Sequence, residues 1–88
     1  VTSNISNFTV APNPFTTKAT VTFAADKAGV MTERLTNMIG SEVYRNLLDV
    51  RSGENKSSID RSNLPAGVYF YSLTDGKSSV TRRVVISE

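Results

Sequence analysis

Apolar and polar residues alternate along most of this chain. In Ala19–Phe23, alanine, valine and phenylalanine take every second position and threonines stand between them. A two-residue period rich in β-branched side chains is typical of a strand with one buried face. Val68–Thr74 is apolar on both faces, as expected of a central strand. A helical period occurs only briefly, at 35–39, and ends at Gly40, so the pattern predicts an all-β protein.

Turn-forming residues divide the chain into about seven strands. Proline or glycine stands in each interval between the alternating stretches. Short strands at such regular spacing indicate an immunoglobulin-like antiparallel β-sandwich. The predicted strands are Ser6–Val10, Ala19–Phe23, Val30–Asn37, Glu42–Val50, Ser57–Asp60, Val68–Thr74 and Ser78–Ser87.

Short motifs predict the shape of three connections. Pro12 and Pro14 each fix their own φ and keep the preceding residue out of the helical region, so the first connection should be extended and rigid. Ser52–Asn55 is expected to be a turn. Asp75 and Gly76 form a dipeptide typical of a type I′ turn, in which both central residues have positive φ, so the last two strands should form a hairpin.

Tyr69 has a predicted structural role at the start of its strand. It follows a Leu-Pro-Ala-Gly run, which is the position of the tyrosine corner in immunoglobulin-like sandwiches, where the hydroxyl bonds the backbone of the upstream loop. Gly67 is expected to supply a backbone shape that a Cβ would obstruct. A direct contact with a partner is the alternative role for both residues.

Glu33 interrupts the apolar row of its strand. The inward-facing residues should be Met31, Glu33 and Leu35, and an unpaired buried carboxylate is costly. Either Glu33 pairs with a nearby arginine such as Arg34 or Arg45, or this strand is an exposed edge.

Composition limits the size of the fold and its partners. The 88 residues are enough for one domain, and without cysteine they can form no disulfide and no thiolate site. Ten basic and eight acidic residues are interspersed, which argues against a surface that binds nucleic acid. No apolar run approaches the ~20 residues needed to span a bilayer, so no direct membrane insertion is expected.

The chain offers no catalytic constellation. It has no histidine, so the usual general base and the commonest metal ligand are both missing. Its serines have no base partner, and its eight carboxylates are scattered one per segment. No calcium-loop spacing and no glycine-rich phosphate cradle is present. We therefore expect no enzyme, no metal site and no cofactor.

Four motifs appear in a family-specific order. They are Pro12-Asn13-Pro14-Phe15, Asn37-Met38-Ile39-Gly40, Asn63-Leu64-Pro65-Ala66-Gly67-Val68-Tyr69 and Arg82-Arg83-Val84-Val85-Ile86. In these motifs and their spacing, the chain resembles the type A C-terminal sorting domain of the Bacteroidota type IX secretion system. The resemblance covers residues 8–88 and leaves 1–7, which are rich in threonine, serine and asparagine, as an upstream linker.

The resemblance implies a role in protein export. Domains of this family carry an N-terminally fused cargo from the periplasm through the outer-membrane translocon, and a surface sortase removes them just upstream. The cargo then stays at the cell surface or outside the cell. The matching positions, which are the recognition candidates, are Pro12, Asn13, Pro14, Asn37, Gly40, Leu64, Pro65, Gly67, Tyr69, Arg82, Arg83, Val84 and Val85.

Two other functions are compatible with a β-sandwich. A fibronectin-like or carbohydrate-binding accessory module of a secreted enzyme would have the same fold, but sugar platforms usually need exposed aromatic residues and this chain has no tryptophan. A structural spacer or adhesin module would occur in the middle of its parent chain or in tandem. The oligomeric state is left open by the sequence.

Overall fold

The computed structural model describes residues 5–88, and these residues form seven strands and no helix. The prediction of an all-β protein is confirmed, and none of the described residues forms a helix that could cross a membrane. The strands are β1 (Ile5–Ala11), β2 (Lys18–Ala25), β3 (Gly29–Thr36), β4 (Glu42–Val50), β5 (Gly53–Asp60), β6 (Gly67–Thr74) and β7 (Ser79–Ile86).

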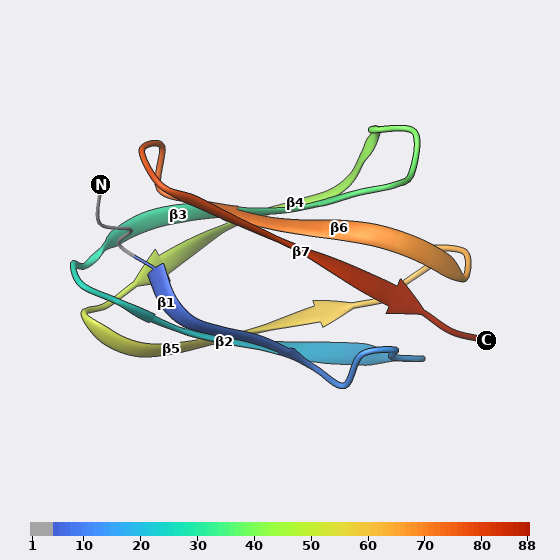
Figure 1. Ribbon diagram of the computed structural model, residues 1–88, viewed down its shortest axis with the longest axis horizontal. Coiled ribbons are helices and arrows are strands. Elements are labelled where there is room, and N and C mark those ends of the chain that lie inside the picture. The colour runs from blue at the N-terminus through green and yellow to red at the C-terminus, as the bar shows by residue number, and fades with distance from the viewer. Residues whose placement is uncertain (1–4) are drawn as a thin grey trace.

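The strands form two facing antiparallel sheets. One sheet has the order β1-β2-β5 and the other has the order β4-β3-β6-β7 (Figure 1). All pairings within the sheets are antiparallel. The predicted immunoglobulin-like β-sandwich is therefore confirmed.

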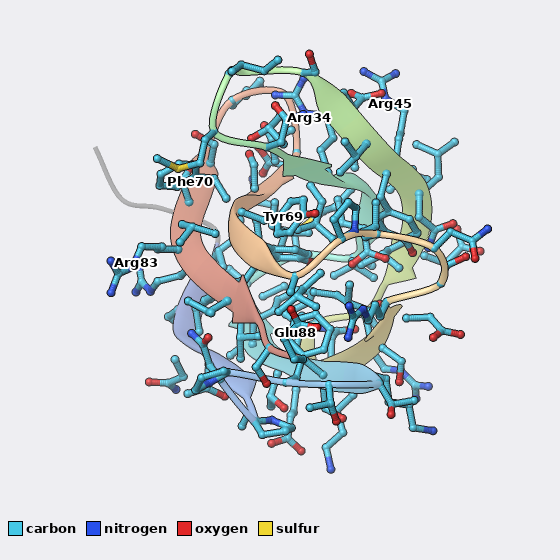
Figure 2. The ribbon with its side chains drawn as sticks, turned by 90° about the vertical axis from the view of Figure 1, so that its right-hand side faces the viewer. Arg34, Arg45, Tyr69, Phe70, Arg83 and Glu88 are labelled. Carbon is cyan, nitrogen blue, oxygen red and sulfur yellow. The ribbon has the colours of Figure 1, made fainter. Side chains whose placement is uncertain are left out.

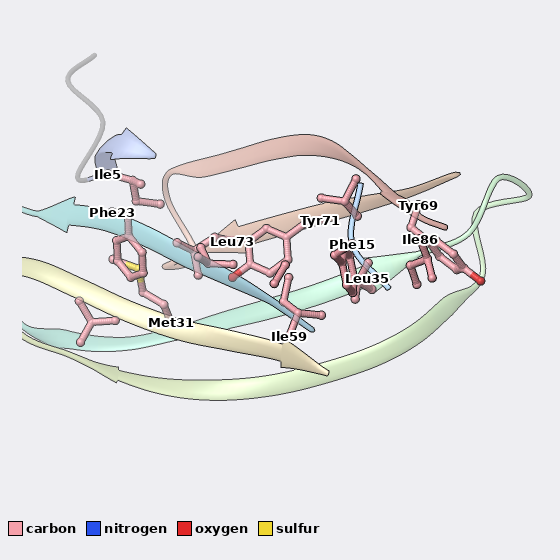
Figure 3. Close-up of a cluster of buried hydrophobic side chains, with 14 of the residues drawn as sticks. Ile5, Phe15, Phe23, Met31, Leu35, Ile59, Tyr69, Tyr71, Leu73 and Ile86 are labelled. Atoms are coloured by element: carbon pink, nitrogen blue, oxygen red, sulfur yellow. The ribbon is translucent and has the colours of Figure 1, made fainter. Parts of the chain in front are cut away.

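The core lies between the sheets and follows the two-residue period. On β2, Ala19, Val21 and Phe23 are buried, whereas the two threonines between them are exposed or half-buried. β6 lies between β3 and β7, which confirms that Val68–Thr74 is a central strand. Figure 3 shows the side chains of both sheets meeting in this core. The largest fully buried apolar residues are Tyr71, Phe15, Phe23, Met31, Leu35, Ile59, Leu73, Ile86, Val21 and Val84.

β1 begins earlier than the predicted domain boundary. Ile5 is buried and pairs with Ala25 of β2, so residues 5–7 lie in strand β1. The burial of this one apolar side chain fixes the start of the strand despite its polar neighbours. The rest of the predicted linker, residues 1–4, lies outside the described residues.

β5 also begins earlier than predicted. Ser52–Asn55 was expected to be a turn, but the strand starts at Gly53 and continues from there to Asp60. Residues 53–56 pair with residues 22–25 of β2, which supplies the hydrogen-bond ladder that their polar side chains do not suggest.

The hairpin between β6 and β7 is confirmed, but its predicted type I′ turn is wrong. Four residues, 75–78, connect the paired Thr74 and Ser79, and only Gly76 of the predicted central dipeptide has positive φ, at 95°. The Asp75 carboxylate accepts hydrogen bonds from the backbone N–H groups of Lys77 at 2.9 Å and Ser78 at 2.7 Å. This side-chain capping favours the longer turn.

Candidate functional site

The sandwich has two chemically different ends. The motif end contains the connections 12–17, 37–41 and 61–66 together with Ser87, and lies on the right in Figure 1. The turn end contains the connections 26–28, 51–52 and 75–78, and β1 begins there at Ile5. Figure 2 looks onto the motif end. Three of the four sequence motifs form this end, and the fourth, on β7, runs into it.

The first and last motifs are bonded to each other. The side-chain amide of Asn13 donates to the carbonyl of Arg83 at 3.1 Å, and its oxygen accepts from the N–H of Val85 at 3.0 Å. Phe15 continues this pairing through its backbone, which donates to Val85 O and accepts from Ser87 N, each at 2.9 Å. The segment thus covers part of the outer edge of β7, an edge that would otherwise be open to other strands.

Pro12 and Pro14 flank Asn13 in the segment that covers the edge of β7. The peptide bonds Ala11–Pro12 and Asn13–Pro14 are both cis. The prediction of an extended connection is wrong, because the chain bends at 12–14 as it crosses from the end of β1 to the edge of β7. Both prolines are exposed, whereas Phe15 is buried in the core.

The middle motif builds the turn between β3 and β4. Asn37 accepts hydrogen bonds on its side-chain oxygen from the N–H groups of Ile39 at 3.2 Å and Ser41 at 2.9 Å. Gly40 has φ of 89°, a left-handed conformation that favours glycine. Asn37 and Gly40 therefore fix the shape of the turn, and its tip presents Met38 and Ile39, which are 67% and 85% exposed.

The third motif contains the predicted tyrosine corner. The hydroxyl of Tyr69 donates to the carbonyl of Pro65 at 2.6 Å, which confirms that role. Gly67 has φ of 154°, but an added Cβ would meet no atom within 4 Å. The backbone conformation, and not a steric obstruction, is what favours glycine there. Leu64 is half-buried and packs against the core.

Arg61 joins three segments of the motif end, and no sequence pattern singled it out. Its guanidinium donates to the carbonyls of Leu64 at 3.0 Å, Ser87 at 2.9 Å and Thr16 at 3.3 Å. One side chain therefore ties the loop after β5 to the first connection and to the residue after β7. An arginine in a polar loop has no periodicity or spacing that would have predicted this.

The residues of the terminal motif have different surroundings. Val84 is completely buried and Val85 is half-buried, so Val84 packs in the core and offers a partner no surface. The guanidinium of Arg82 lies 5.3 Å from the centre of the Phe8 ring, which is within cation–π range. Arg83 points away from the body of the domain (Figure 2). Of these four candidates, Arg83 is the one whose side chain is most available for recognition.

The environment of Glu33 is neither an arginine partner nor an exposed edge strand, which were the two alternatives from the sequence. It is completely buried, and its carboxylate accepts hydrogen bonds from four neutral side chains. The donors are Tyr71 at 2.6 Å, Asn46 at 3.0 Å, Tyr44 at 3.2 Å and Ser57, which lies 3.1 and 3.2 Å from the two oxygens. Ser57 belongs to β5, so the carboxylate also bonds the opposite sheet.

Both proposed explanations of Glu33 were therefore wrong. β3 lies between β4 and β6 and is not an edge. Arg34 and Arg45 instead approach Glu42, at 3.7 and 3.2 Å, on the exposed side of the sheet. Alternation places both arginines on the face opposite Glu33, so they cannot reach it.

The Glu33 cluster changes the acidity of its tyrosines. Burial, followed by the charge of Glu33 and its hydrogen bond, raises the pKa of Tyr44 to about 12. Burial and the hydrogen bond to Glu33 raise the pKa of Tyr71 well above its usual range. Both hydroxyls thus stay protonated as donors to the carboxylate at neutral pH.

A shallow notch lies where the second and third motifs meet. Its volume is about 340 Å³, and it is lined by residues 37–39 of the β3–β4 turn and residues 65–69 before and at the start of β6. Among residues 5–88, no charged side chain lines it. The lining residues are Asn37, Met38, Ile39, Pro65, Ala66, Gly67, Val68 and Tyr69.

Comparison with known proteins agrees with the motifs. No curated protein matches the chain. The family described as the secretion system C-terminal sorting domain matches residues 9–87, which is nearly the whole chain. The chain therefore belongs to this family of type IX secretion sorting domains.

Proposed function

We propose that this domain is the export signal of a cargo protein fused at its N-terminal side. It takes the cargo from the periplasm through the outer-membrane translocon of the type IX system. A surface sortase then cuts upstream of β1, and the cargo stays at the cell surface or outside the cell. The domain itself serves as the recognised element, since a sorting signal is not itself catalytic.

The arrangement of the four motifs supports this proposal in addition to the family membership. All four motifs meet at or run into the motif end, although 72 residues separate Asn13 from its partner Val85. The cargo side of the chain enters the domain at Ile5, at the opposite end. A cargo attached there leaves the motif end free for the export machinery.

The carbohydrate-binding alternative lacks a suitable surface. All seven aromatic residues lie in the described part of the chain, and each is buried or half-buried. Sugar-binding platforms usually present aromatic faces to solvent, so the aromatic residues of this domain favour a structural role.

A fusion experiment tests the proposal. The domain is joined to the C-terminus of a periplasmic reporter in a bacterium with a type IX system, and the reporter is measured in the periplasm, on the surface and in the medium. We expect it outside the periplasm and shortened by the loss of the domain. An intact fusion retained in the periplasm, in a strain that exports its own cargo normally, would refute the proposal.

A pair of charge variants tests whether Arg83 contributes to recognition. Arg83→Gln removes an exposed cation from β7, next to the carbonyl that bonds Asn13, and Lys77→Gln removes one from the connection 75–78 at the turn end. Exposed charges contribute little to stability, so both variants should fold. We expect export to fall for Arg83→Gln alone. Equal export of the two variants would remove Arg83 from the recognition surface.

A further inference from the structure

The β3–β4 turn exposes two large apolar side chains that the fold does not need. Met38 and Ile39 are 67% and 85% exposed, so neither contributes much to the core. The turn is nevertheless held in one shape by the two hydrogen bonds to the Asn37 side chain and by the left-handed Gly40. A fixed presentation lowers the entropy that a binding partner would have to overcome.

The opposite wall of the notch is held just as firmly. Tyr69 bonds the carbonyl of Pro65, and Arg61 bonds the carbonyl of Leu64. Ala66 and Val68 between and beside these residues are half-buried and line the hollow. Both walls thus exist before any partner arrives, as is usual for binding sites.

We propose that this notch, lined by residues 37–39 and 65–69, binds an uncharged apolar segment of a protein of the export machinery. The inference rests on the proposed function and locates its recognition surface. Because the described part of the chain places no charged side chain in the notch, an acidic or basic segment would lose hydration there without gaining a partner. A volume of about 340 Å³ is at the lower end of ligand pockets and suits one or two apolar side chains.

The position of the notch supports a partner outside the cargo. Ile5, the first residue of β1, lies at the turn end, whereas the notch is at the motif end of a molecule whose longest dimension is 36 Å. The turns at the other end contain polar and charged residues, including Asp26, Lys27 and Asp75. The apolar tip is thus at the end that a fused cargo leaves accessible.

Two double variants of the reporter fusion test this proposal. Met38→Ser with Ile39→Ser removes the apolar wall, and Val30→Ser with Leu47→Ser is the matched control, because Val30 and Leu47 are 58% and 66% exposed but lie outside the notch. Both should melt like the wild type. We expect export to fall about tenfold or more for the first pair and to stay unchanged for the control. Equal export by the two folded variants would overturn the proposal.

Single changes at Ile39 test the chemistry of the partner. Ile39→Leu should export like the wild type, whereas Ile39→Asp and Ile39→Lys should both lose export by about tenfold. Normal export by the lysine variant together with loss by the aspartate variant would indicate an anionic surface such as a lipid bilayer, and would overturn the proposal. If the wild-type fusion itself is not exported, the proposed function fails. If it is exported and all Ile39 variants are too, only the notch is refuted.

Discussion

The two ends of the sandwich are built in different ways. At the turn end, the hydrogen bonds of Asp75 and Asn55 join residues two to four positions apart, as in Asp75 with Ser78. At the motif end, Asn13 bonds residues 70 and 72 positions away, and Arg61 bonds residues 45 and 26 positions away. The turn end has one such bond between distant segments, from the Ser52 hydroxyl to the Asp26 carbonyl at 3.3 Å. The motif end combines local turns, such as the one that Asn37 caps, with several bonds between segments that are distant in sequence.

This difference explains what most of the sequence motifs do. Asn13, Asn37, Gly67 and Tyr69 hold the motif end together. Tyr69 is buried and Asn37 and Gly67 are half-buried, so these three offer a partner only part of their surface. Met38 and Ile39 are large exposed apolar residues at the same end, and they stand between Asn37 and Gly40, which fix the turn. In the proposed function, the motifs therefore act mainly by positioning a recognition surface, and they supply only part of it.

The largest expected difference is between the two ends of β7. Ile86 is 1% exposed at the motif end, and Val80 is half-buried at the turn end. Ile86→Ala should lower the free energy of unfolding by about 3 kcal/mol, and Val80→Ala by about 1 kcal/mol. Urea denaturation of both variants measures this. A similar loss of unfolding free energy in both variants would contradict the claim that β7 stabilises the motif end more than the turn end.

Removal of Arg61 should have the next largest effect. Arg61→Ala leaves three backbone carbonyls without their charged donor, and should cost about 2 kcal/mol of unfolding free energy. Arg51→Ala, an exposed arginine at the turn end, is the control and should stay within about 0.5 kcal/mol of the wild type. Thermal melts of both variants measure this difference in stability. Equal melting temperatures would show that the Arg61 contacts contribute little.

Amide hydrogen exchange can show whether the loss of one side chain acts on a distant segment or on a nearby one, and the expected energies are smaller here. Asn13→Ala should cost about 1 kcal/mol and speed exchange of the Val85 amide, 72 residues away. Asn55→Ala should speed exchange of the Arg51 backbone amide, four residues away, because that N–H donates to the Asn55 side chain. Unchanged exchange at Val85 in the Asn13 variant would contradict the edge-cover role.

The Glu33 cluster gives a predicted effect that is visible only in alkali. Since the pKa of Tyr44 is about 10 in the unfolded chain and about 12 in the fold, its contribution is complete below pH 10 and is lost as the pH rises to 12. Stability measured by urea between about pH 9 and about pH 11 should therefore fall. Tyr44→Phe should make that fall shallower. An identical fall in both proteins would exclude Tyr44 as its source.

Most strands and the tyrosine corner could be predicted, whereas the turn shapes at 12–14 and 75–78 and the contacts between distant segments could not. The alternation in Ala19–Phe23 was sufficient because it is a property of the strand itself. The tyrosine corner was also predictable, since Tyr69 and Pro65 are four residues apart. The early start of β5 was missed because Gly53 and its polar neighbours become strand only by pairing with β2.

Glu33 and Arg61 were missed for the same physical reason. The four donors to Glu33 come from β4, β5 and β6, and nothing in the local sequence indicates that they converge. The partners of Arg61 are backbone carbonyls, which every residue has, so the sequence does not identify them. The recognition candidates could be named from their motifs, but their division into structural and exposed residues required the fold.

Export of two insertion variants tests most directly that the export information lies at the motif end. A short Gly-Ser insertion is placed between Ile39 and Gly40 in one reporter fusion and between Gly76 and Lys77 in the other, and both domains are first shown to be folded. We predict that the turn-end insertion is exported like the wild type and that the motif-end insertion stays in the periplasm. Normal export of the motif-end insertion, or loss of export for the turn-end insertion alone, would contradict the account.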